Sequence, residues 1–185
     1  VMKKVETAEQ LAQPSTIAAD AYISADYARA ERDHLWRKVW LQAGRIEDLR
    51  EPGDYITYDI GPDSVIIILG DDGALRAFHN VCVHRGRRLI DTPEGQRNAR
   101  GNKTNMICGF HGWTYDREGQ CTFAQHKDDW QGALTPERTA LGKVLVDQWG
   151  GWIWINLDPT AGPLLEWLNP VPDMLNPFQL QNMRN

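Results

Sequence analysis

The feature that most constrains this chain is a pair of short segments, each of which carries one cysteine and one histidine. Residues 82–86 read CVHRG and residues 108–113 read CGFHGW. Together they offer two thiolates and two imidazoles, which is the number of ligands that a small inorganic centre requires. We therefore expect the rest of the chain to be a scaffold that brings together Cys82, His84, Cys108 and His111.

Two inorganic centres are compatible with this ligand set. Zinc accepts two cysteines and two histidines, but its usual motifs place cysteine beside cysteine and histidine beside histidine. Here each segment pairs one cysteine with one histidine. A [2Fe–2S] cluster in which one iron takes the thiolates and the other takes the imidazoles fits that layout, because each loop sends one side chain to each iron. We favour the cluster, and a structural zinc-binding module is the alternative.

The two segments resemble the Rieske motif, in the form found in the large (alpha) subunit of Rieske-type aromatic-ring-hydroxylating oxygenases. The flanking sequences AFHNV before Cys82 and TYD after the second segment are also similar to that family, and the resemblance runs from about residue 22 to about residue 158. It implies a Rieske-type [2Fe–2S] cluster. In that cluster Cys82 and Cys108 hold the inner iron, and His84 and His111 hold the outer iron.

This ligand set has a consequence for the redox potential. In the oxidised centre the charges of two ferric ions are cancelled by two sulfides and two thiolates, so the centre is neutral, whereas four thiolates would leave it doubly negative. An incoming electron therefore meets less repulsion. Rieske centres accordingly have potentials of about −150 to +300 mV, against about −400 mV for plant-type ferredoxins.

Side chains beside the ligands indicate where in that range this protein falls. The resemblance implies that high-potential Rieske proteins carry an extra cysteine where this chain has Arg87 and Phe110. They also carry a serine hydroxyl in the place of Trp113, while Tyr115 keeps their tyrosine hydroxyl. Without the serine, one of two hydrogen bonds that favour the reduced cluster is lost. We predict a potential in the lower part of the range.

Other side chains near the ligands have two interpretations each. Trp113 either covers the cluster or faces the electron acceptor. The arginines of this region either present a positive face to an acidic electron donor or pair with carboxylates such as Asp91. These arginines are Arg85, Arg87 and Arg88.

Composition and charge narrow the function classes. The 185 residues are 42% hydrophobic, which suffices for one well-packed domain with appendages. A formal charge of −5 and a pI of about 5.5 argue against a nucleic-acid or membrane-surface partner. The first residues show no apolar signal core, and Cys121 stays unpaired once two cysteines are assigned to metal. We therefore expect a reducing, cytoplasmic location.

A helix is expected near the N-terminus. Apolar residues recur at roughly helical spacing after Ser24, so Ser24 or Asp26 is expected to cap a helix that ends near Lys38. Trp36 and Trp40 are expected to pack against the domain that follows.

From residue 49 onward the periodicity becomes that of short strands separated by glycine-rich turns, which is the pattern of hairpins. The candidate strands are residues 55–60, 64–69, 75–78, 113–115, 120–123, 143–148 and 152–156. The fold class is therefore mainly β. We expect a Rieske-type antiparallel β-sandwich with a small cluster-binding subdomain, plus an N-terminal helix.

The connecting segments and the C-terminal tail show less regular hydrophobic periodicity than the strands. Residues 85–107 form a longer passage than this family usually has, and Gly86 and Gly112 are expected to allow tight turns beside the ligands. Residues 124–139 are polar and are expected to form a solvated surface loop. Residues 164–168 are expected to form a short helix with a proline near its first position.

The histidines outside the two segments give no second metal site. Oxygenases of this family hydroxylate at a mononuclear iron held by two histidines and a carboxylate. His34 and His79 are expected to be structural and His126 to be solvated. A mononuclear non-haem iron is therefore expected only in a catalytic domain that is missing from this chain.

Our interpretation is the electron-transfer domain of a ring-hydroxylating oxygenase, which would not hydroxylate by itself. The resemblance implies a ferredoxin or reductase as donor, the catalytic domain of the same or a neighbouring subunit as acceptor, and a homo-oligomer that catabolises aromatic hydrocarbons. The runner-up is a free-standing Rieske ferredoxin, which would need neither the helix nor the tail. The expected divisions are an arm (1–20), a helix and connection (21–48), a Rieske domain (49–158) and a tail towards the catalytic domain (159–185).

Overall fold

A seven-stranded antiparallel sheet forms the body of the molecule, in a computed structural model that describes residues 17–183. The strands run in the order β1-β10-β9-β4-β3-β2-β5. Their bounds are β1 Leu41–Arg45, β2 Asp54–Ile60, β3 Asp63–Leu69, β4 Leu75–His79, β5 Arg100–Asn102, β9 Lys143–Trp149 and β10 Trp152–Asn156. The mainly β, antiparallel class predicted from the sequence is confirmed. The sheet reaches beyond the predicted 49–158 domain, because β1 pairs with β10.

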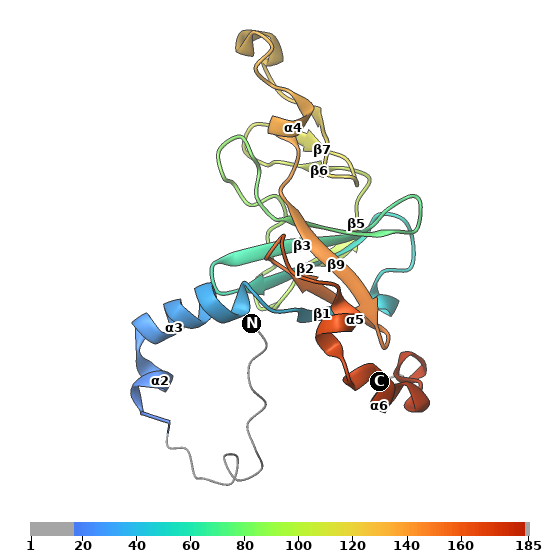
Figure 1. The fold of residues 1–185 in the computed structure, drawn as a ribbon. Coiled ribbons are helices and arrows are strands. Elements are labelled where there is room, and N and C mark those ends of the chain that lie inside the picture. Colours follow the sequence, from blue (N-terminus) through green and yellow to red (C-terminus); the bar gives the residue numbers. More distant parts are fainter. Residues whose placement is uncertain (1–16, 184–185) are drawn as a thin grey trace.

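A second, three-stranded sheet lies at one end of the large one (Figure 1). It consists of β6 Met106–Ile107, β7 Thr114–Tyr115 and β8 Cys121–Phe123. This small sheet carries the second cysteine–histidine segment between β6 and β7, so it corresponds to the small subdomain that was expected.

Strand β3 is buried on both faces, which explains its continuous apolar run. Side chains alternate across a strand, so successive residues enter different cores. Val65 and Ile67 enter the core that is shared with β1, β9 and β10. Ile66 and Ile68 enter the core that is shared with the small sheet, and that core also contains Cys82 and other residues near it. β3 is therefore the platform on which both halves of the molecule rest.

The N-terminal helix begins where the sequence predicts, and its helical turns continue to Trp36, close to the predicted end near Lys38. The Ser24 hydroxyl accepts a hydrogen bond from the Tyr27 amide, so Ser24 is the N-cap of α3 (Ala25–Glu31). A π-helical turn, η1 (Arg32–Trp36), follows it, and a short helix, α2 (Asp20–Ile23), precedes it. The arm predicted for residues 1–20 lies mostly outside the described residues.

The two tryptophans expected to anchor this region differ. Trp40 is buried against Leu164 and Leu168 of α5 (Leu164–Leu168), and its indole nitrogen donates to the carbonyl of Gly162. Trp36 is 39% exposed, so its predicted packing is wrong. Trp36 lines an open hollow together with Tyr58 and the turn after β2, so a space separates η1 from the sheet at this point.

The remaining helices are short. They are α4 Pro136–Thr139, α6 Val171–Leu175 and the 3-10 turns η2 Ile46–Asp48, η3 Lys127–Trp130, η4 Asn176–Phe178 and η5 Leu180–Asn182. Helix α5 has the bounds predicted for it. None of the helices in residues 17–183 has the length and apolar character that a membrane span requires.

One buried side chain organises the long passage between the two segments. The Asn80 carboxamide donates to the carbonyl of Ile90 (2.8 Å) and to the Ser64 hydroxyl (3.0 Å). Its oxygen accepts from the amides of Leu89 (3.1 Å) and Ile90 (2.9 Å). All four hydrogen-bonding positions of the amide are thus used. The passage is pinned directly beneath the first segment, although the sequence shows no regular pattern there.

We predict that Asn80→Ala lowers the free energy of unfolding by about 3 kcal/mol, because buried peptide groups of residues 89 and 90 lose their partners. Urea denaturation of the whole chain measures this effect. The matched control is Asn102→Ala, since Asn102 also makes two side-chain hydrogen bonds but is exposed. A loss of under about 1 kcal/mol is expected for the control, and equal losses would contradict the role given to Asn80.

Candidate metal centre

The two cysteine–histidine segments form loops with the same closure. In the first loop the amide of Cys82 donates to the carbonyl of Arg87 (2.8 Å), and the amide of Gly86 donates to the carbonyl of Cys82 (2.9 Å). In the second loop the amide of Cys108 donates to the carbonyl of Trp113 (2.8 Å), and the amide of Gly112 donates to the carbonyl of Cys108 (3.0 Å). Gly86 and Gly112 both have φ of +70°, which explains why glycine is required at the closing position.

The loops bury the two predicted cysteines and bring the two predicted histidines into contact, although among residues 17–183 no three His, Cys, Asp or Glu side chains are already arranged as a metal site. The Cys82 and Cys108 side chains are 1% and 3% exposed, so the thiols lie inside the molecule. His84 and His111 are half-buried, and their ring centroids are 4.7 Å apart. The two thiols are thus buried inside the molecule, and the two half-buried imidazoles meet edge to face, with their planes at 67°.

The protonation states of these groups suit metal binding. Burial raises the pKa of the Cys82 thiol, and the neighbouring Cys108 adds to the rise. A buried pair of thiols gives up its protons readily only when a cation lies beside it. Burial also lowers the pKa of His84, with the charges of His111 and Arg85 acting in the same direction. The imidazole of His84 is therefore neutral near pH 7, which is the form that binds a metal.

One nitrogen atom of the site is free to bind a further group. The Nδ1 atom of His111 is buried and has no hydrogen-bond partner among the described residues. An unsatisfied buried polar atom costs about 1–3 kcal/mol. Metal coordination would satisfy this nitrogen, so the donor set fits an inorganic centre held by two sulfurs and two nitrogens.

Aromatic rings enclose both imidazoles. Trp113 is buried and stacks on His84, with ring planes 3° apart and centroids 4.9 Å apart. Phe110 lies beside His111 with centroids 3.8 Å apart, and Trp130 meets His84 edge-on at 6.3 Å. Of the two interpretations of Trp113, covering the site is the one that its burial supports. The contact of Trp130 was missed, because the loop of residues 124–139 was expected only to be solvated.

Tyr115 contacts one of the two buried cysteines. Its hydroxyl lies 3.1 Å from the sulfur of Cys82, and the side chain is fully buried. Burial and the neighbouring Cys82 raise the pKa of this phenol, which therefore keeps its proton. The hydroxyl can donate a hydrogen bond to a sulfur that carries negative charge.

Two of the three arginines near the site pair with carboxylates. Arg87 forms a two-point contact with Asp91, with one N–O distance of 2.7 Å, and Arg88 donates to Asp59 at 2.9 Å. Arg85 is exposed and makes no ion pair with any residue in the range 17–183. A broad positive docking face is therefore not formed, and internal pairing holds for the other two arginines.

The remaining candidate residues lie outside this arrangement. His34 is exposed on η1, so the structural role expected for it is not supported, whereas His79 is half-buried on β4. His126 is exposed, as expected, 3.8 Å from a carboxylate oxygen of Asp129. Cys121 has a half-buried free thiol.

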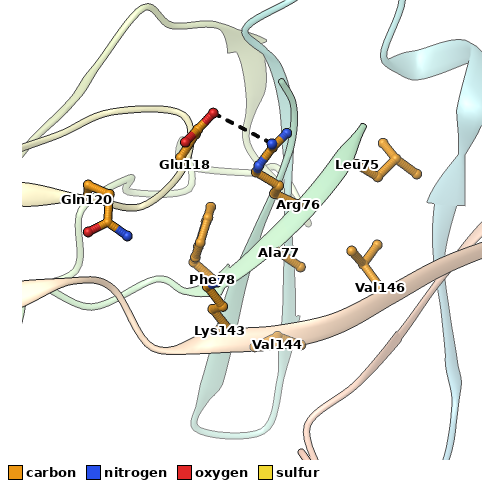
Figure 2. Close-up of a pocket in the computed structure, with 9 residues that line it drawn as sticks. All are labelled: Leu75, Arg76, Ala77, Phe78, Glu118, Gln120, Lys143, Val144 and Val146. Atoms are coloured by element: carbon orange, nitrogen blue, oxygen red, sulfur yellow. Dashed lines mark ion pairs between the residues drawn. The ribbon is translucent and has the colours of Figure 1, made fainter. Parts of the chain in front are cut away.

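A cavity of about 330 Å³ opens where β4 and β9 diverge (Figure 2). Val144 and Val146 contribute to its apolar lining, and Glu118 reaches towards Arg76 at its rim. Arg76 is already paired with Asp72, at 2.8 Å for each of two contacts. None of the predicted site residues lines this cavity, so the candidate centre is the loop pair.

We predict that Gly112→Ala lowers the free energy of unfolding by about 1 kcal/mol, because a β-carbon disfavours the left-handed backbone. No atom lies within 4 Å of the added carbon, so the loss would come from the backbone alone. Gly109→Ala is the matched control, since that position in the same loop is equally open but lacks a positive φ. Urea denaturation checks both variants, and equal stability of the two would contradict the assignment.

Comparison with known proteins identifies the domain that contains both loops. The family model of the Rieske [2Fe–2S] domain matches residues 39–134, which include both loops. The glycine betaine monooxygenase oxygenase subunit of Chromohalobacter salexigens is 30% identical over 154 residues, covering 83% of this chain and 33% of the relative. The carnitine monooxygenase oxygenase subunit of Acinetobacter baumannii is 30% identical over 156 residues, covering 84% of this chain and 40% of the relative.

Solved structures share the fold. The apo form of a quaternary ammonium Rieske monooxygenase has a TM-score of 0.76 and 28% identity, covering 85% of this chain and 44% of that chain. A naphthalene 1,2-dioxygenase has a TM-score of 0.73 and 30% identity, covering 82% of this chain and 33% of that chain. The chain thus spans between 33% and 40% of the length of the two curated relatives. With both loops inside a match that covers more than half of its residues, the chain belongs to the Rieske [2Fe–2S] domain family.

Proposed function

We propose that this chain is the electron-transfer domain of a Rieske oxygenase subunit, with its cluster held by Cys82, His84, Cys108 and His111. The observation that carries the proposal is the contact between the His84 and His111 rings on two loops that each also bury a cysteine. The unpartnered Nδ1 of His111 supports the same ligand set. It marks the atom through which that histidine would bind.

A bound Rieske cluster supplies reversible one-electron redox chemistry. Cys82 and Cys108 would hold the inner iron, because their sulfurs lie deepest in the molecule. His84 and His111 would hold the outer iron, because they lie nearer the surface. Gly86 and Gly112 close the two loops around them.

The side chains around the ligands support a low potential for a Rieske centre. The Tyr115 hydroxyl is within hydrogen-bonding distance of the Cys82 sulfur and favours the reduced, more negative state. Trp113 stands where high-potential proteins are expected to place a serine donor, and its ring stacks on His84. One of the two side-chain hydrogen bonds to the sulfur atoms is therefore kept and the other is lost.

The surface above the imidazoles indicates how partners would dock. Val83, Phe110 and Trp130 are 39%, 58% and 43% exposed beside the histidines, whereas Arg87 is neutralised by its carboxylate partner. We propose a mainly apolar contact with the catalytic domain of the same or a neighbouring subunit in a homo-oligomer. The proposed electron donor is a ferredoxin or a reductase.

The substrate of the intact enzyme is a further proposal. Naphthalene 1,2-dioxygenase, by its name, supports the aromatic substrate expected from the sequence. The curated relatives are named for glycine betaine and carnitine, which are not aromatic. Aromatic catabolism therefore stays a prediction, as does a cytoplasmic location. In the intact enzyme the hydroxylation would occur at a mononuclear iron in the catalytic domain.

Redox titration monitored by EPR tests the proposed function. We predict a coloured oxidised protein with two irons per chain, an EPR signal that appears on reduction, and a midpoint potential below about +100 mV. A colourless protein that is EPR-silent after reduction and holds stoichiometric zinc would support the zinc module instead. A cluster with a higher potential would contradict the influence assigned to Tyr115 and Trp113.

A further inference from the structure

Trp130 lies at the tip of an arm, residues 124–139, that connects the small sheet to β9. Figure 1 shows this arm extending beyond β6 and β7 at the end of the molecule opposite to α6. Ala124 and Leu134 pack against the core around Cys82, so both ends of the arm are anchored. The tip between them contains the 3-10 turn η3, which ends at Trp130.

The tip is held to the rest of the domain without polar contacts. Within the described part of the chain, hydrogen bonds and ion pairs of residues 126–133 all stay inside the arm. The ring of Trp130, in contrast, reaches His84, with centroids 6.3 Å apart and planes at 77°. That geometry is the edge-to-face contact that aromatic pairs favour. The ring of Trp130 therefore links the tip to His84.

His84 is surrounded by three rings. Trp113 stacks on one face of the imidazole, and His111 lies 4.7 Å away on another side. Trp130 closes a third side, and it is 43% exposed, so water lies on its outer surface. Removal of the Trp130 indole would bring water to the His84 ring.

We infer that Trp130 is a positioning residue that screens His84 from water and thereby lowers the redox potential of the bound cluster. The inference rests on the proposed function, because it requires His84 to be a ligand. On reduction the neutral centre gains one electron and one negative charge. Water stabilises a charged centre more than a neutral one, so exclusion of water favours the oxidised state.

The experiment compares three variants of the whole, cluster-loaded chain. Trp130→Ala removes the screen, and Trp130→Phe keeps an aromatic ring in its place. Trp167→Ala is the matched control, because Trp167 is 49% exposed and makes a similar ring contact, at 6.4 Å, with Trp154 on the other side of the molecule. Dithionite donates one electron per cluster and ferricyanide removes it, and EPR gives the midpoint potential.

We expect Trp130→Ala to raise the midpoint potential, Trp130→Phe to restore most of the wild-type value and Trp167→Ala to leave it unchanged. The second readout is the spin-echo modulation of the reduced cluster in D2O. Deuterium modulation should deepen in Trp130→Ala, since more solvent reaches the His84 ring.

Each other outcome is decisive. An unchanged or lower potential in Trp130→Ala with the cluster retained would overturn the screening role and leave the proposed function intact. Equal shifts in Trp130→Ala and Trp167→Ala would overturn it too, as would loss of the cluster from Trp130→Ala alone. Absence of a cluster from the wild-type chain would instead overturn the proposed function, and this inference with it.

Discussion

Two thiols buried side by side are the constraint on which this structure depends. A buried thiol packs as a small apolar side chain, but a buried thiolate needs a partner that supplies positive charge. In this chain the same two loops carry two imidazoles in contact, one of which has a buried nitrogen with no partner among residues 17–183. Binding of the proposed cluster by the four side chains would satisfy this nitrogen and stabilise the thiolates.

Strand β3 supports the buried thiols, because both of its faces are packed in a hydrophobic core. One face of β3 completes the core of the large sheet, and the other supports the small sheet and both loops. Asn80 then fixes the long passage between the loops with four hydrogen bonds. Gly119 adds close contact between the sheets, because a β-carbon at this position would overlap the ring of Phe78. The core on one face of β3, the hydrogen bonds of Asn80 and the close packing at Gly119 together support the two loops.

Much of the fold was predictable because its signals are local. The hairpins from β2 to β4, the hairpin of β9 and β10, and helix α5 follow alternation, turn residues and a helix-starting proline. Strands β1, β5 and β6 were missed. β1 and β5 pair with residues distant in sequence, and β6 has only 2 residues. β5 is also exposed, so its residues show no apolar alternation.

The site divides in the same way. The spacing of cysteine and histidine predicted the four candidate ligands, because each pair lies within one short segment of the sequence. The ring of Trp130 on His84 could not be predicted, because no spacing links residue 130 to residue 84. The pairing of Arg88 with Asp59 is equally non-local. Trp36 was predicted to be packed but is 39% exposed, because an apolar pattern at helical spacing does not by itself imply burial.

The most direct test of this account is the redox potential of the His111→Cys variant, with His34→Cys, at an exposed histidine on η1, as the control. A thiolate in place of a neutral imidazole adds negative charge at the outer iron, so the account predicts that the cluster is kept and its potential falls towards the ferredoxin range of about −400 mV. The control should keep the wild-type potential. An unchanged potential in His111→Cys with the cluster retained would show that His111 is not bound to iron and would contradict the account.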